Sequence, residues 1–249
     1  RKMVAPSFTP KAIRGLEEDM RLKIRELLEN VEGKSEFNFV TEIAEQLPLW
    51  VLCEMMGIPE SDRSKIRDLV NNLTDASIQQ DPNNSFQIWV NYMELFKMGR
   101  DMIEERRKKP TDDLMSVVAN TKVEGGDLPP ELLDGFFLLM VIAGNETTRN
   151  TLTGGLMALT ENPSEREKLL KDPSLIANAT DEMLRWVTSV IYFRRTATKD
   201  TNIRGQDIKA GDKIIMWYGS ANRDEDIFID GHLFNCLLYT SDAADECDS

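Results

Sequence analysis

Eight consecutive apolar residues, 136–143, interrupt an otherwise mixed pattern of apolar and polar positions. A helix that is apolar on every side is normally buried, so the pattern predicts a core helix over about residues 131–160. The polar segment 145–148, which contains Glu146 and Thr147, follows without any turn signal. Burying an acid and two hydroxyls is costly unless they are paired or used. We therefore expect either a satisfied polar cluster or a functional site within this helix.

Two residues at the junction change the local geometry. Gly144 removes a side chain directly before the polar segment, so another group can approach the backbone closely there. Thr147 lies four residues after Ala143, and its hydroxyl can therefore donate to the Ala143 carbonyl and bend or widen the helix.

Helical spacing of apolar residues recurs through most of the remaining chain. The segment from residue 190 to 217 differs, because β-branched and aromatic residues alternate there with turn signals. The predicted fold is thus mainly α with a small β region. Besides the central helix, the expected helices cover residues 10–31, 37–57, 61–77, 86–109, 112–120, 164–171 and 174–187.

Composition excludes several classes of protein. The formal net charge of −13 disfavours a nucleic-acid partner. No apolar run reaches the length of a membrane span, and no signal segment is evident, so we expect a cytoplasmic protein. A single histidine, His232, argues against a histidine-based metal site. Three cysteines without close pairing argue against a disulfide framework, and Cys53 in its apolar segment is expected in the core.

Three further motifs stand out, and the first two point to buried charges. Glu182 and Arg185 are three residues apart on one helix face and are flanked by apolar residues, which predicts a partly buried structural ion pair. The segment 193–197 places Arg195 in an apolar strand. In a mainly buried strand, a guanidinium implies an anionic group nearby. The segment 221–224 (Ala-Asn-Arg-Asp) forms a polar turn after a hydrophobic strand.

Together, these motifs resemble the soluble bacterial cytochrome P450 family of haem monooxygenases. The segment 143–148 (Ala-Gly-Asn-Glu-Thr-Thr) is similar to the family's oxygen-activating helix, and Glu182-x-x-Arg185 is similar to its helix ion pair. The resemblance implies a partial cytochrome P450 fold and haem b as cofactor. Arg195, and Arg1 near the end of an early helix, would then bind the haem propionates.

The resemblance also implies roles for the central helix. Thr147 would hydrogen-bond the bound oxygen, and Glu146 would relay protons from solvent. Ala143 and Gly144 would leave room for the oxygen beside the widened helix turn. Val141, Ala143, Val190 and Ile191 would line the cavity for a hydrophobic substrate.

Within the family, the segments 141–150, 193–197 and 216–225 resemble enzymes that act on sterol side chains and methyl-branched lipids. Such an enzyme inserts one oxygen atom from O2 into a C–H bond. Its electrons come from NAD(P)H through a ferredoxin and a ferredoxin reductase.

The chain also departs from the family pattern. Family members carry a glycine-rich loop with the iron-ligating cysteine, and no such loop is present here. Cys236 lacks the flanking glycines, so we expect no metal ligand from it and read it as a surface-like residue. Residues 1–234 are thus interpreted as the central portion of a cytochrome P450 domain. Residues 235–249 are interpreted as an unrelated or artefactual tail.

Two expectations follow from these departures. The chain as given is expected to be inactive, although it derives from a monooxygenase. The alternative is a non-catalytic helical protein that binds a small molecule without haem.

Overall fold

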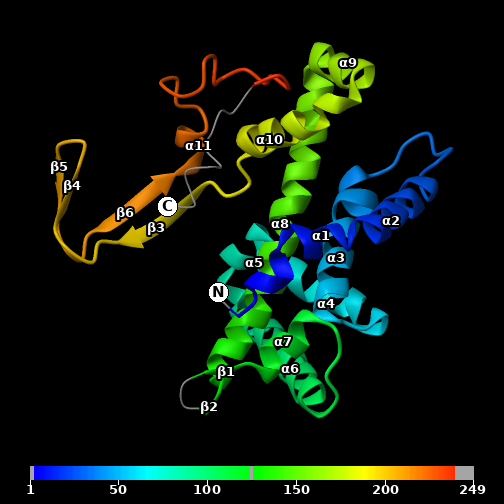
Figure 1. Cartoon of the computed structure of the whole chain (residues 1–249), viewed down its shortest axis with the longest axis vertical. Coiled ribbons are helices and arrows are strands. Elements are labelled where there is room, and N and C mark those ends of the chain that lie inside the picture. The colour runs from blue at the N-terminus through cyan, green and yellow to red at the C-terminus, as the bar shows by residue number, and fades with distance from the viewer. Residues whose placement is uncertain (1–2, 124–125, 239–249) are drawn as a thin grey trace. The chain divides into compact units, whose positions relative to one another are not determined.

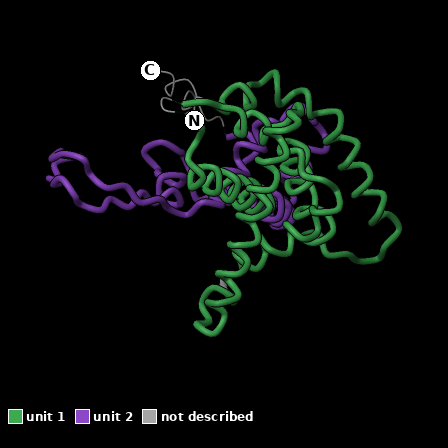
Figure 2. The backbone as a smooth tube through the Cα atoms, turned by 90° about the horizontal axis from the view of Figure 1, so that it is seen from below, with its two compact units in different colours: residues 1–149 green, residues 150–249 purple. Residues whose placement is uncertain are grey.

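The computed structural model describes residues 3–123 and 126–238. The chain divides into two compact units, residues 1–149 (unit 1) and 150–249 (unit 2), which Figure 2 shows in separate colours. Helix α8 (Pro130–Glu161) begins in unit 1 and ends in unit 2 (Figure 1). The bounds of α8 confirm the central helix predicted over about residues 131–160.

Where the structure describes unit 1, its regular elements are helices apart from the short hairpin β1 (Lys122–Val123) and β2 (Gly126–Asp127). Its helices agree with the predicted ones within a few residues, except that the segment predicted over 10–31 is interrupted near Gly15. The helices before α8 are η1 (Ala5–Phe8), α1 (Pro10–Arg14), α2 (Glu17–Glu29), η2 (Val40–Ala44), α3 (Gln46–Met56), α4 (Glu60–Thr74), α5 (Ala76–Gln80), η3 (Pro82–Asn84), α6 (Ser85–Lys108) and α7 (Leu114–Asn120).

The segment predicted as one helix over 37–57 begins as the π-helix η2 and continues as α3. Pro48 has no N–H group to donate to the carbonyl of Ala44, four residues earlier, so the regular α-helical bonding cannot continue through that point. Gly57 ends α3 with φ of 67°, a left-handed conformation that favours glycine.

The core of unit 1 collects apolar side chains from α3, α4, α6, α7 and α8. Helix α8 contributes Leu133, Phe137 and Val141 to this core. Its other side is exposed, with Leu132 61% and Leu139 62% accessible. The expectation of a helix buried on every side is therefore wrong for the described chain, since unit 1 covers only one face of α8.

A buried polar cluster ties three helices of unit 1 together. The Arg106 guanidinium donates to Asp113 Oδ2 (2.6 Å) and to the Gly57 carbonyl (2.8 Å). Asp113 also accepts from the Thr111 hydroxyl (2.5 Å) and from the Ser116 N–H (2.7 Å) at the start of α7. Burial alone would raise the pKa of Asp113, but these hydrogen bonds and the guanidinium charge outweigh it and hold the pKa below its usual range.

We expect Asp113→Asn to destabilise the chain at neutral pH but much less in acid. Because the folded-state pKa lies below the unfolded value of about 3.9, the stabilisation by Asp113 is fully present above that value. It is lost as the pH falls through the folded-state pKa. Urea titrations between pH 7 and pH 3 should show the gap between parent and variant closing. The exposed neighbour Asp112 supplies the control Asp112→Asn, and an equal response of both variants would contradict this role of Asp113.

In its described residues, unit 2 contains the second part of α8, three further α-helices and two two-stranded antiparallel sheets (Figure 1). Strand β3 (Tyr192–Thr196) pairs with β6 (Lys213–Trp217), with Arg195 opposite Ile214, and β4 (Thr201–Ile203) pairs with β5 (Gln206–Ile208). These strands confirm the predicted β region. The helices are α9 (Pro163–Lys171), α10 (Ile176–Val187) and α11 (Tyr218–Ala221), and the 3₁₀ turn η4 (Pro173–Leu175) precedes α10.

The core of unit 2 includes residues from the segment predicted to be an unrelated tail. Ala158, Ala179, Phe234 and Cys236 form one buried cluster. The Cys236 N–H donates to Glu165 Oε2 (3.0 Å), and no part of Cys236 is exposed. The interpretation of Cys236 as surface-like is therefore wrong. Residues 235–238 pack with unit 2, whereas residues 239–249 lie outside the described chain.

Candidate active site

The polar turn of α8 carries the predicted pair Glu146 and Thr147. The Thr147 hydroxyl donates to the Ala143 carbonyl at 3.0 Å, which confirms the hydrogen bond predicted from the four-residue spacing. The chain nevertheless stays α-helical through this turn, so the predicted widening is not seen. Glu146 is partly exposed and pairs with Arg149 at 3.4 Å. The carboxylate and the hydroxyl thus lie on adjacent residues, and Glu146 has access to solvent.

Small residues precede this pair. Ala143 and Gly144 are both exposed, and a Cβ atom on Gly144 would approach the Leu52 side chain of α3 at 3.4 Å. Val141, predicted to line a substrate cavity, is fully buried in the core of unit 1. The structure therefore brings Ala143, Gly144, Glu146 and Thr147 together on two adjacent turns of one helix.

Asn145 is the polar residue of this turn that is completely buried, and the sequence reasoning did not single it out. Its side chain is 0% exposed, and neither its Oδ1 nor its Nδ2 atom has a hydrogen-bond partner in the described chain. The sequence does carry a signal for this burial. Asn145 follows the apolar residues Phe137 and Val141 at four-residue spacing, which places all three on one face of the helix.

In unit 2, Glu182 and Arg185 form a bidentate ion pair with N–O distances of 2.6 and 2.8 Å. Their side chains are 0% and 4% exposed, which confirms the prediction of a buried pair. The Arg185 guanidinium also donates to the carbonyls of Asn222 (2.7 Å), Gly231 (2.7 Å) and Leu233 (3.0 Å). Glu182 in turn accepts from the Asn235 N–H at 2.7 Å. The pair thus anchors α10 to three backbone carbonyls and one N–H of the chain that follows α11.

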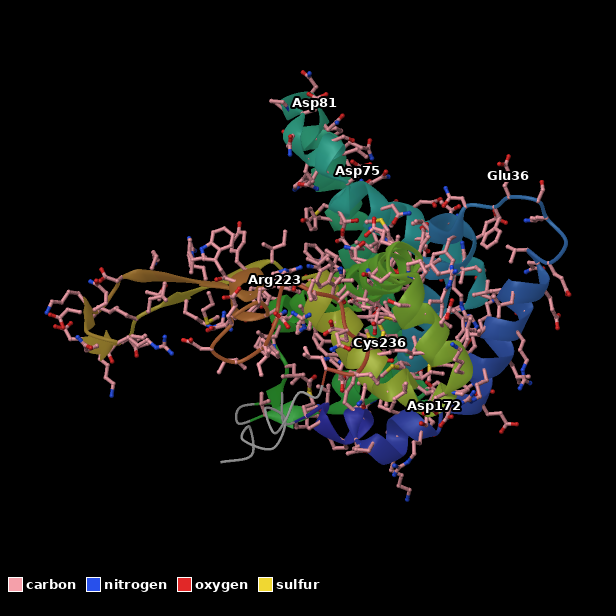
Figure 3. The ribbon with its side chains drawn as sticks, turned by 90° about the horizontal axis from the view of Figure 1, so that it is seen from above. Glu36, Asp75, Asp81, Asp172, Arg223 and Cys236 are labelled. Atoms are coloured by element: carbon pink, nitrogen blue, oxygen red, sulfur yellow. The ribbon has the colours of Figure 1, made fainter. Side chains whose placement is uncertain are left out.

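The predicted turn 221–224 completes this anchoring. Asn222 donates to the Thr188 hydroxyl (2.9 Å) at the end of α10. Arg223, labelled in Figure 3, donates to the Trp186 carbonyl at 2.9 Å and lies 5.1 Å from the centre of the Trp186 ring. The turn is therefore structural in the described chain, and it holds the end of α10 against the segment that leads to Phe234.

Arg195 lies on an exposed strand, not on the mainly buried strand considered from the sequence. Its guanidinium donates to the Arg194 carbonyl (3.2 Å) and lies 5.6 Å from the centre of the Phe193 ring. An exposed guanidinium on this strand can bind an external carboxylate such as a haem propionate. Val190 is half-buried and Ile191 is exposed just before β3, while Arg1 lies outside the described residues.

Neither described cysteine fits the axial thiolate ligand of a haem. Burial is the main cause that raises the pKa of the Cys236 thiol to about 11, and the negative charges of Glu165 and Glu182 add to it. Burial likewise raises the pKa of Cys53 to about 11. Both side chains are therefore neutral thiols near pH 7, and both are fully buried in the cores of their units, away from any position open to a haem. Figure 3 marks the position of Cys236.

Comparison with known proteins decides the family. The sequence model of the family described as Cytochrome P450 matches residues 170–242. The chain is 37% identical to the steroid C26-monooxygenase of Rhodococcus jostii over 95% of its own length. The chain belongs to the cytochrome P450 family.

Two further cytochrome P450 relatives extend the comparison. The chain is 35% identical to the methyl-branched lipid omega-hydroxylase of Mycobacterium tuberculosis, with 94% of this chain and 56% of the relative covered. A Mycobacterium marinum cytochrome P450 solved in complex with pseudoionone superimposes with a TM-score of 0.89. It is 35% identical, with 95% of this chain and 58% of that chain covered. The chain covers 49% of the Rhodococcus enzyme, so it spans about half the length of the curated relatives it matches.

Among the described residues, no helix combines the length and the apolarity that a bilayer span requires.

Proposed function

We propose that the chain forms part of a haem-thiolate monooxygenase that inserts one oxygen atom from O2 into a C–H bond of a hydrophobic small molecule. The observation that carries this proposal is the polar turn at Glu146 and Thr147 of α8, in a chain that resembles monooxygenases along 95% of its length. In this family, the haem iron activates O2 through its cysteine thiolate. The chain's own residues would position the substrate and control protons.

Proton delivery is the role that the geometry of α8 supports. Glu146 reaches solvent and lies one residue from the Thr147 hydroxyl. A hydroxyl that already donates to the Ala143 carbonyl still has lone pairs with which to accept a proton donor. Protons would pass from solvent to the Glu146 carboxylate and then to the Thr147 hydroxyl. The hydroxyl would deliver them to the proposed oxygen-binding site, from which bulk water is otherwise excluded.

Cofactor binding would be shared with other parts of the whole protein. Arg195 has an exposed guanidinium that suits a propionate, and Arg1 would supply a second one. The axial thiolate would come from neither Cys53 nor Cys236, because both side chains are fully buried in the cores of the two units. The proposed central domain covers residues 1–234, and residues 235–238 pack with its second unit. The remaining haem contacts would come from other parts of the whole protein.

The proposed substrates are sterol side chains or methyl-branched lipids, the classes that the names of the Rhodococcus and mycobacterial relatives specify. Ala143, Val190 and Ile191 are the residues proposed to contact such a substrate, whereas Val141, also predicted to do so, is fully buried in the core of unit 1. For electrons, we propose NAD(P)H as the source and a ferredoxin with its reductase as the carriers.

A chimaera tests the proposal directly. Residues 1–234 of this chain would replace the matching segment of the Rhodococcus jostii steroid C26-monooxygenase, which keeps its own remaining segments and thus its own ligating cysteine. We expect the chimaera to bind haem, to give a thiolate-type absorption band with carbon monoxide, and to hydroxylate a sterol or a branched lipid. A folded chimaera that binds lipid but no haem would favour the alternative, a non-catalytic helical binding protein.

In the active chimaera, Thr147→Ala should keep haem binding but release at least about tenfold more hydrogen peroxide per NAD(P)H consumed, since a positioned proton-transfer group contributes about 10²–10⁴-fold to rate. The reason is that water replaces a positioned hydroxyl beside Glu146. The adjacent, exposed Thr148 supplies the control Thr148→Ala, which should leave the ratio of product to peroxide nearly unchanged. Equal coupling in both variants and the parent would reject this role for Thr147.

A further inference from the structure

The backbone turn at the end of α10 has an unusual conformation. Thr188 follows the helix with φ of 46° and ψ of 58°, in the left-handed region. A β-branched residue seldom adopts this conformation, because its branched side chain crowds the backbone there. Strained positions of this kind persist only where the surrounding structure holds them, and they concentrate at functional sites. The conformation of Thr188 must therefore be held by its neighbours.

Two hydrogen bonds of the Thr188 side chain hold this turn. The hydroxyl donates to the Arg185 carbonyl at 2.6 Å and accepts from Asn222 Nδ2 at 2.9 Å. Asn222 Nδ2 also donates to the Arg185 carbonyl at 3.3 Å, so the three groups form one small network. Thr188 is buried, and water therefore competes little for these bonds. The network joins the end of α10 to the turn after α11.

The chain beyond this turn is fixed at two further points before β3 begins. The hydroxyls of Ser189 and Thr151 lie 2.8 Å apart, which ties the segment to the second part of α8. The Ile191 carbonyl accepts from the Tyr218 N–H at 2.9 Å, at the start of α11. The segment 188–191, which connects α10 to β3 in Figure 1, is thus held to three helices of unit 2.

This anchored segment carries two of the residues proposed to contact the substrate. Val190 is half-buried, and Ile191 is 61% exposed. An apolar side chain can select a substrate by its shape only if the backbone beneath it is held in place. Hydrogen bonds at residues 188, 189 and 191 meet this condition, and the strained residue stands first in the segment.

We propose that Thr188 is a positioning residue for substrate selection. Its hydroxyl fixes the left-handed turn, and the turn fixes where Val190 and Ile191 meet the substrate. The inference rests on the proposed function and takes its substrate classes, sterol side chains and methyl-branched lipids. A single methylene changes selection in an apolar pocket by about 10–200-fold, so a displaced pocket wall should alter the preference between these two classes.

Amide hydrogen exchange in the full 249-residue chain tests whether Thr188 fixes the segment. Thr188→Val keeps the branched shape but removes the hydroxyl, and it should make the Tyr218 amide exchange about tenfold faster, because two buried hydrogen bonds are lost. Thr188→Ser keeps the hydroxyl and should restore the parent rate. The amides of α9 should keep their parent rates in both variants. Unchanged exchange at Tyr218, or an increase that the α9 amides share equally, would overturn the proposal.

A further variant covers the case in which the valine variant does not fold. Thr188→Gly also lacks the hydroxyl, but glycine adopts the left-handed conformation without strain. It should show the same faster exchange at Tyr218 in a folded chain. Parent-like exchange in this variant would mean that the backbone conformation alone fixes the segment, and would overturn the role of the hydroxyl.

The matched control is Thr180→Val. Thr180 lies on the same helix, and its hydroxyl also donates to a backbone carbonyl, that of Ile176 at 2.8 Å, but its side chain is exposed. This variant should leave the exchange at Tyr218 unchanged. An effect equal to that of Thr188→Val would show that the loss of any hydroxyl on α10 loosens the segment, and would overturn the proposal.

Substrate selection is measured in the chimaera that carries residues 1–234, with a sterol and a methyl-branched fatty acid as probes. Thr188→Val should change the ratio of the two dissociation constants by at least about fivefold, and Thr188→Ser should restore it. A residue with a purely structural role would weaken both affinities alike, so an unchanged ratio would overturn the proposal.

The two measurements separate this inference from the proposed function. A parent chimaera that binds neither probe would contradict the proposed function, and the selective role of Thr188 with it. Faster exchange at Tyr218 in the full chain would still show that Thr188 fixes the turn.

Discussion

Glu182→Ala should lower the thermal unfolding midpoint of the chain by about 6–20 °C. Removing one partner of a buried ion pair costs roughly 3–5 kcal/mol. In a protein of 150–250 residues, each kcal/mol shifts the midpoint by about 2–4 °C. The variant would leave the Arg185 guanidinium without its carboxylate in a site where the pair is almost fully buried. It would also remove the acceptor of the Asn235 N–H.

The matched control is Glu26→Ala. Glu26 pairs with Lys23 at 2.7 Å, and the two residues are three apart in the sequence, as Glu182 and Arg185 are. The Glu26 side chain, however, is 58% exposed. Exposed pairs contribute about 0–1 kcal/mol, so this variant should melt within a few degrees of the parent. Thermal melting by circular dichroism of both variants makes the comparison. A Glu182→Ala midpoint within about a degree of the parent would show that burial of the pair adds nothing to stability.

The 249-residue chain, reconstituted with haem, reduced and exposed to carbon monoxide, should show no absorption band of a thiolate-ligated haem. Cys236 is fully buried, its N–H donates to Glu165, and its thiol has a pKa raised to about 11. Ligation would require both deprotonation and removal of this residue from the core of unit 2. Cys236→Ser should therefore give the same spectrum as the parent.

The chimaera that carries residues 1–234 together with the relative's own ligating cysteine is the positive control for this experiment. It should show the band under the same conditions, which would demonstrate that residues 1–234 are compatible with haem. A clear thiolate-type band from the 249-residue chain, abolished by Cys236→Ser, would contradict our assignment. It would mean that residues 234–238 leave the packed arrangement and that Cys236 binds the iron.

Local patterns in the sequence determined most of the secondary structure. The uninterrupted apolar run and the following turn located α8 to within a residue or so at each end, because helix length and periodicity are encoded over adjacent residues. The four-residue spacing of Ala143 and Thr147 was enough to predict their hydrogen bond, and the spacing of Glu182 and Arg185 was enough to predict their ion pair. These contacts form within a single helix, so they need no knowledge of the tertiary fold.

Contacts between segments that are distant in the sequence could be identified only from the tertiary structure. Arg185 also binds the carbonyls of Gly231 and Leu233, and Cys236 is buried beside Glu165; neither contact has a local signature in the sequence. Asn145 looked like one polar residue among four, and only the packing of α8 showed that it, and not Glu146 or Thr147, is fully buried. Burial depends on which face of a helix its neighbours cover, and amino-acid spacing defines the faces without specifying those neighbours.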